Sequence, residues 1–272
     1  MDKKTAIMGP MLAALLAVGC GADATDAPAA RTEQAAQASP RSDGDTARSD
    51  LAERLSDPSR PAEDRARDAS RKPAEVVGFL GIEPGMRVLD AIAAGGWYTE
   101  VLSIAVGPKG RVVAQNPDFA LEYGGGRNDK ALTARLTDDR LPNVTRLDKN
   151  FSEMSAADGP FDAAITALNF HDVYNGMGPE AASTFLGAIY DVLKPGGVLG
   201  ITDHVGIAGN DNEGLHRIEK ATVIDTVEAA GFELVGESDV LENPADDHTQ
   251  PVFSDAIRGK TDRFVLKFRK PE

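Results

Sequence analysis

From Pro73 to the C-terminus, short apolar runs of strand length alternate with helical stretches. The first five apolar runs lie at 87–92, 110–115, 143–148, 161–168 and 198–203. The helical stretches between and after them lie at 97–106, 128–137, 179–193 and 213–230. Strands that alternate with helices form βαβ units, because a parallel strand needs a long crossover to return to the same edge of the sheet. The pattern therefore predicts a parallel sheet with helices on both faces.

The end of the chain departs from this alternation. Two strand-like segments, 232–242 and 263–269, are joined by a long polar loop without a helical stretch. Strands joined in this way pair in the antiparallel direction. We therefore expect a Rossmann-like, doubly wound α/β fold, whose seven-stranded sheet is mostly parallel with one antiparallel edge strand.

The start of the chain has the composition of a targeting segment. Lys3 and Lys4 precede a mostly apolar stretch at 7–18, which is shorter than the roughly 20 residues of a transmembrane helix. This layout is typical of a secretory signal. The stretch ends in Gly19-Cys20, which resembles the lipobox of bacterial lipoproteins. The resemblance implies a signal peptide over 1–19, lipidation at Cys20 and a periplasmic position at the outer membrane. An ordinary secreted protein and a cytosolic protein are the alternatives.

The next segments lead from the signal to the α/β region. Residues 20–44 are rich in Ala, Asp, Ser, Thr and Pro, which predicts a flexible tether. Residues 45–72 are charged, with Leu51 and Leu55 one helical turn apart, and they predict N-terminal helices. The domain proper is expected over 73–272.

Charge and cysteine content limit the partners. The chain has 29 Lys and Arg against 43 Asp and Glu, a net charge of −14. Nucleic-acid binding needs a basic surface, so we expect no nucleic acid as partner. The same negative charge disfavours direct binding of the protein surface to anionic lipids, so membrane contact is expected only through the lipid anchor. One cysteine excludes an intrachain disulfide. No feature predicts the oligomeric state.

The turn after the first strand is the most informative segment. Asp90 lies near the strand end, and small residues including Ala94, Gly95 and Gly96 precede the helix at Trp97. Small residues allow the backbone to approach a ligand closely. Ligands of doubly wound sheets bind at this edge, where the N-terminus of the next helix favours negative groups. We expect Asp90 and this turn to contact a ligand.

This turn resembles motif I of class I S-adenosylmethionine-dependent methyltransferases. Two other segments share the resemblance, Asn-Phe-His-Asp at 169–172 and Lys-Pro-Gly-Gly at 194–197. Together with Gly-Gly-Trp-Tyr-Thr-Glu at 95–100 they are similar to a family of predicted bacterial methyltransferases that often carry signal peptides. The resemblance covers 73–272. It implies an enzyme, S-adenosylmethionine as its cofactor and a small molecule as its methyl acceptor.

The resemblance also implies positions for the cofactor. Asp90 and the turn would face its methionine part. Gln115 and Asn116, which end the second strand, would face the ribose, and Asp148 the adenine. Asn169 would hold either the cofactor or the acceptor.

Catalysis is expected at the end of the fourth strand. His171 is the candidate general base, because the ordinary pKa of histidine lies near neutral pH. Asp172 would orient it. Asp203 and His204, at the end of the fifth strand, have either a structural role or a place in the lining of the acceptor pocket.

The chain departs from the family pattern at three places. Ile92 and Ala94 stand where glycines are usual, and no acidic residue ends the second strand. The alternative function is therefore a small-molecule-binding protein without catalysis on the same scaffold. A nicotinamide dehydrogenase is a poorer option, because G-x-G-x-x-G is absent after the first strand.

The remaining histidines predict no site of their own. A metal could be imagined between Asp246-Asp247-His248, His171 and His204, but no compact ligand spacing supports it. We therefore expect no metal. His216 and Arg217, on the late helix, are expected at the surface or in a lid.

Overall fold

A seven-stranded sheet forms the centre of residues 43–272, the part of the chain that the computed structural model describes. The predicted signal peptide (1–19), Cys20 and nearly all of the predicted tether lie outside the described residues. The strands are β1 (Arg87–Ala91), β2 (Arg111–Asn116), β3 (Val144–Asp148), β4 (Phe161–Ala167), β5 (Leu193–His204), β6 (Glu233–Ser238) and β7 (Arg263–Arg269).

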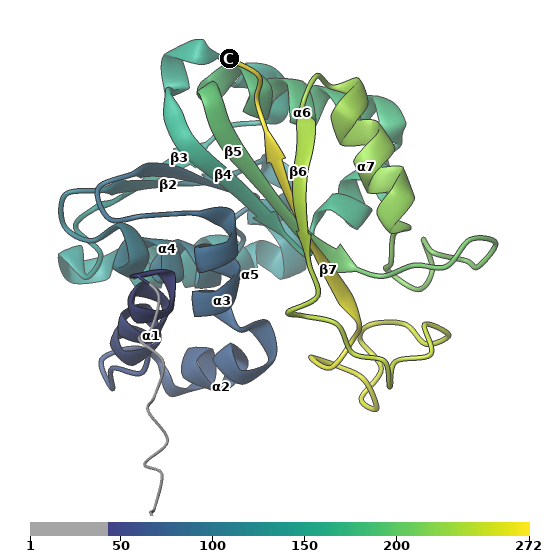
Figure 1. The fold of residues 1–272 in the computed structure, drawn as a ribbon, viewed down its shortest axis with the longest axis horizontal. Helices are drawn as coiled ribbons and strands as arrows, with labels where there is room; N and C mark the ends of the chain where they lie inside the picture. The colour runs from purple at the N-terminus through teal and green to yellow at the C-terminus, as the bar shows by residue number, and fades with distance from the viewer. Residues whose placement is uncertain (1–42) are drawn as a thin grey trace, which may run out of the picture. The chain divides into compact units, whose positions relative to one another are not determined.

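The strands lie in the order β3-β2-β1-β4-β5-β7-β6 (Figure 1). The pairs among β1 to β5 are parallel, and β7 runs antiparallel to both β5 and β6. The reversed strand therefore lies beside β6 at one edge. This confirms the predicted Rossmann-like sheet, mostly parallel with an antiparallel edge.

Helices cover both faces of the sheet. They are α1 (Asp43–Leu55), α2 (Ala62–Arg71), α3 (Pro73–Leu80), α4 (Trp97–Val106), α5 (Asp118–Leu136), α6 (Pro179–Val192) and α7 (Lys220–Ala229). One apolar core includes Leu186 of α6 and Val227 of α7. The other includes Leu51 of α1, Leu80 of α3 and Leu102 of α4. Figure 1 shows these two groups of helices apart from each other. None of the helices within 43–272 combines the length and apolar character that crossing a bilayer requires.

Two helices differ from the prediction. α5 runs from Asp118 to Leu136, but its backbone is not helical over 123–126, so the helix predicted over 128–137 corresponds to its second part and the first part was not predicted. Three successive glycines have φ between +61° and +79° there, a conformation that glycine adopts without steric cost. α7 begins only at Lys220, although 213 was predicted. The preceding segment is not helical because His216 has a φ of +53°.

The carboxyl ends of β1 and β4 lie side by side where the winding of the sheet reverses. β1 pairs with β2 on one side and with β4 on the other. Ligands of open α/β sheets bind at such a switch point. The segments that follow these two strands, 92–96 and 168–172, are therefore where a site is expected.

Candidate functional site

The turn between β1 and α4 holds an unusual backbone. Ile92, Ala94 and Gly96 have φ values of +58°, +49° and +81°. Glycine adopts this left-handed conformation readily, whereas a β-branched residue rarely does. Ile92 and Ala94 thus keep the backbone shape that glycines would give, at a steric cost.

Three side-chain carboxamides, those of Gln115, Asn116 and Asn169, hold this turn; we call them the carboxamide clamp. Gln115 Oε1 accepts the Ile92 N–H at 3.1 Å, and Asn169 Nδ2 donates to Ile92 O at 3.0 Å. Asn116 accepts the Ala94 N–H at 2.8 Å and donates to Ala94 O at 3.1 Å. The N–H and C=O groups of Ile92 and Ala94 are therefore already hydrogen-bonded to side chains of the protein.

The clamp bears on the expectation that Gln115 and Asn116 face the ribose of a cofactor. Gln115 and Asn116 are fully buried, and their carboxamides bind the turn and the backbone of Lys149. The structure therefore brings them to the turn and does not leave them free at its surface. Asp148, predicted near the adenine, is exposed and pairs with Arg146 at 2.9 Å. Assignment of these residues to a cofactor stays a prediction.

A buried ion network lies against the same turn, and the sequence analysis missed it. Arg135 of α5 donates from Nε to Gly95 O at 3.0 Å and pairs with Glu100 and, at 2.7 Å, with Asp64 of α2. Arg140 pairs with Glu100 at 2.6 Å. The residues of this network are far apart in the chain, so no local sequence pattern predicts that they pair. Only the three-dimensional structure shows that they are neighbours.

The aromatic residues at the start of α4 belong to the core. Trp97 and Tyr98 are each 5% exposed and lie in the apolar core on the α4 face. Trp97 Nε1 donates to Asp64 O at 3.1 Å. These contacts place α2 against the start of α4.

Asp90 is buried beneath the turn. Its Oδ2 accepts a hydrogen bond from Thr99 Oγ1 at 2.6 Å. Burial raises the pKa of Asp90 to about 6, and the Thr99 hydrogen bond and the positive charge of Arg135 oppose this rise. Such a perturbed carboxyl at a ligand-binding edge is typical of functional sites.

Asp203, rather than the predicted Asp172, holds Nδ1 of His171. The Asp203 carboxylate lies 2.7 Å from His171 Nδ1 and accepts the backbone N–H of His171 at 2.9 Å and of His204 at 2.8 Å. Asp172 lies 3.2 Å from the opposite ring nitrogen, Nε2, with its side chain 49% exposed. The reason is topological, because the end of β5 lies beside the segment that follows β4.

The electrostatics of the two buried histidines differ. Burial by itself would lower the pKa of His171, but the carboxylates of Asp203 and Asp172 outweigh it and raise the pKa to about 10. Burial lowers the pKa of His204 to about 3, so this ring is neutral. His204 Nδ1 lies 2.7 Å from Thr261 Oγ1. A general base must be free of its proton, and the two carboxylates oppose that state in His171.

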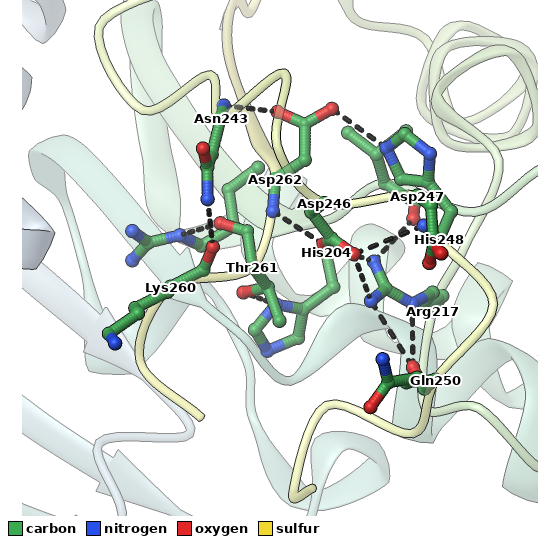
Figure 2. A network of polar contacts seen from close by, with 12 residues as sticks. His204, Arg217, Asn243, Asp246, Asp247, His248, Gln250, Lys260, Thr261 and Asp262 are labelled. Carbon is green, nitrogen blue, oxygen red and sulfur yellow. Dashed lines mark hydrogen bonds and ion pairs between the residues drawn. The ribbon is translucent and has the colours of Figure 1, made fainter. Parts of the chain in front are cut away.

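The loop after β6 is tied down through Arg217, which is fully buried and not on the surface as predicted. Figure 2 shows its guanidinium bound to both carboxylate oxygens of Asp246, at 2.9 and 3.0 Å, and to the Gln250 carbonyl. His248 Nε2 lies 2.9 Å from Asp262 in the same network. Asp246 and His248 therefore anchor this loop, and within the described residues no hydrogen bond or ion pair joins them to His171.

A cavity of about 450 Å³ opens at the same edge of the sheet. It is lined by charged side chains of both signs, among them Lys220, Glu237, Asp239, Asp262 and Arg263. Its volume suits a small ligand. The mixed charges favour a polar one.

Solved structures share this fold. A methyltransferase from Aquifex aeolicus that depends on S-adenosylmethionine is 22% identical, and the match covers 82% of this chain and 97% of that one with a TM-score of 0.55. The [4+2]-cyclase SpnF is 18% identical, with 75% and 81% covered and a TM-score of 0.54. A methyltransferase from Clostridium acetobutylicum ATCC 824 that depends on the same cofactor is 12% identical, with 75% and 92% covered and a TM-score of 0.51.

These likenesses define the class of fold, which is that of S-adenosylmethionine-dependent methyltransferases. No protein-family model and no curated protein matches this chain. At these identities the fold is shared, and the function must be argued from the site.

The strain in the turn gives a first prediction. Ala94→Gly removes a steric cost of about 1–2 kcal/mol at a left-handed position, against an entropic cost of about 0.5–1 kcal/mol. The free energy of unfolding should therefore stay equal or rise by up to about 1.5 kcal/mol. The matched control, Ala93→Gly, lacks that relief and should lower it. Urea denaturation measures both; equal losses in the two variants would show that Ala94 is not strained.

Asp90 gives a prediction about pH. Its folded-state pKa of about 6 lies above the ordinary value of 3.8, so the folded state binds the proton more tightly. Stability should therefore fall as pH rises from about 4 to 7, by on the order of 3 kcal/mol, relative to Asp90→Asn. Denaturation of both proteins at several pH values measures the difference. Parallel profiles would contradict the raised pKa.

Proposed function

We propose that this protein is an S-adenosylmethionine-dependent methyltransferase that acts on a small polar molecule. The observation that carries the proposal is the turn after β1. Ile92, Ala94 and Gly96 keep the left-handed backbone of a glycine-rich turn, at the switch point of a sheet with the methyltransferase strand order. A strained conformation that is retained without glycine points to a function for that shape.

The residues fit one half of the cofactor better than the other. Asp90 and the Gly95–Gly96 backbone lie where a methionine part would bind, and the buried carboxylate suits its ammonium group. At the ribose end, no acidic residue ends β2, and Gln115 and Asn116 bind the turn. Ribose contacts would require these carboxamides to exchange partners. When bound, the cofactor would supply the activated methyl group.

The acceptor is proposed to bind at the ends of β4 and β5. Asp203 fixes the His171 ring, so that Nε2 points toward Asp172. We assign to His171 and Asp172 the binding and orientation of the acceptor, because orientation is what a methyl-transfer site chiefly supplies. The charged lining of the cavity beside β6 and β7, which includes none of these three residues, supports a polar ligand at this edge of the sheet.

A second candidate is a binding protein without methyl transfer. The carboxamide clamp favours it, because the clamp occupies the peptide groups of Ile92 and Ala94. The [4+2]-cyclase among the fold neighbours also supports it, since this fold is not restricted to methyltransferases. Export would favour it further, because a charged cofactor does not cross a bilayer unaided.

The proposed location is the periplasmic side of the outer membrane. The support is the sequence alone: the signal-like segment at 1–19, Gly19-Cys20 and the tether composition that follows. Lipid at Cys20 would be the only membrane contact, and the net charge of −14 supports the absence of nucleic acid as partner.

Calorimetric titration with S-adenosylmethionine tests the two functions. The protein used is the full chain with Cys20→Ser, which cannot be lipidated. The enzyme proposal expects micromolar binding, weakened about 10–100-fold in Asp90→Asn through the loss of a hydrogen bond to a charged group. Asp138→Asn, on an exposed turn, is the control and should bind as the parent does. A folded protein that does not bind would favour the second candidate.

Metabolic labelling with palmitate tests the location. Label should appear in the membrane fraction for the natural chain and disappear in Cys20→Ser. Label that persists in this variant, or that is absent from both proteins, would rule out lipidation at Cys20.

A further inference from the structure

Three side chains of metal-binding type meet beside the end of β4. The ligand atoms are His171 Nε2, Asp172 Oδ1 and His216 Nδ1, and all lie within 4.8 Å of one another. Within residues 43–272 they form the one such group of histidine, cysteine and carboxylate side chains. His216 comes from the segment before α7, 44 positions along the chain from Asp172.

The distances suit a single ion. Asp172 Oδ1 lies 3.2 Å from both His171 Nε2 and His216 Nδ1. Ligands about 2.0–2.1 Å from a tetrahedral zinc ion lie about 3.3 Å from one another. Two of the three ligand separations therefore already have the length that a shared ion requires, and the third is at most 4.8 Å.

His171 supplies a second, independent observation. Its side chain is 4% exposed, and its Nε2 is buried without a hydrogen bond. Asp172 Oδ1 lies 3.2 Å from it as an ion-pair contact and forms no hydrogen bond with it. Buried polar atoms in folded proteins nearly always have a partner, so this nitrogen lacks one that a metal ion would provide.

Asp203 completes the pattern expected around a metal-bound histidine. Imidazole ligands commonly donate their other ring N–H to a carboxylate, which fixes the tautomer and turns the free nitrogen toward the metal. Asp203 holds His171 Nδ1 at 2.7 Å and is fully buried. Nε2 is thereby directed at Asp172 and His216.

His216 is held in place by its neighbours. Its φ of +53° is uncommon for a residue other than glycine. The next residue, Arg217, is anchored through its guanidinium to Asp246 and receives at its carbonyl a hydrogen bond from Asn175 Nδ2 at 2.8 Å. Asn175 belongs to the same turn as Asp172 (Asp172–Gly176), so the two ligand-bearing segments are tied together.

We propose that His171, Asp172 and His216 bind one divalent transition-metal ion. Two imidazoles and one carboxylate favour zinc, iron or cobalt over magnesium or calcium, which prefer oxygen ligands alone. Asp172 and His216 are 49% and 40% exposed, so the remaining coordination positions face solvent. Such an open site would take an oxygen of a hydroxyl or carboxylate compound and polarise it. This proposal does not depend on methyltransferase activity.

The test is titration of the chelator-treated full chain with zinc by calorimetry, and with cobalt by visible absorption. The chain carries Cys20→Ser, so that no thiol competes. We expect one ion per chain. Loss of the oriented carboxylate in Asp203→Asn should weaken binding about 10–100-fold, and His216→Ala should weaken it at least as much. His216 is partly exposed, so its removal should leave the fold intact, as thermal unfolding of the metal-free proteins will show.

The matched control is His248→Ala, which removes a histidine that pairs with Asp262 outside the cluster. It should bind zinc as tightly as the parent protein. Absence of stoichiometric binding in the parent would overturn the proposal, as would equal affinity in the His216→Ala and parent proteins. No S-adenosylmethionine is present, so a failure here is distinct from a failure of the methyltransferase proposal.

Discussion

The hydrogen bonds of the carboxamide clamp are the constraint on which the site depends. Left-handed backbone at Ile92 and Ala94 costs about 1–2 kcal/mol per residue. Four side-chain hydrogen bonds offset this, each with a net contribution of about 0.5–1.5 kcal/mol. Because Gln115 and Asn116 end β2 and Asn169 follows β4, the clamp also joins the ends of three adjacent strands. The left-handed shape of the turn and the occupied peptide groups of Ile92 and Ala94 thus have one cause, the bonds of the clamp.

Several buried charges near this edge are paired, although the chain is strongly acidic; Asp90 is an exception, held by a hydrogen bond from Thr99. Glu100 is neutralised by two arginines, Asp246 by Arg217, and Asp203 by His171. Removal of one partner from such a pair leaves an uncompensated buried charge, which costs about 3–5 kcal/mol. The first pairs join α4 to α5 and to the loop after it, the second joins the segment before α7 to the loop after β6, and the third joins the end of β5 to the segment after β4.

Much of the fold could be predicted because its signals are local. The helix at Trp97–Val106 and the strand at Arg263–Arg269 have the predicted ends, since apolar spacing over a few residues determines them. The sequence did not predict the first part of α5, which left-handed glycines separate from the predicted second part, and α7 begins later than predicted, after the left-handed His216. The predicted seven-stranded, mostly parallel sheet is confirmed because βα alternation leaves few topologies.

The sequence by itself determined the order of strands and helices, the acidic character, and the presence of small residues and polar groups at the strand ends. The tertiary structure decided what those groups contact. Asp203 rather than Asp172 holds His171, the carboxamides bind the turn, and His216 joins a cluster with residues far from it in the chain. The physical reason is that periodicity is a property of neighbouring residues, whereas side-chain partners are set by packing between segments that no local pattern relates.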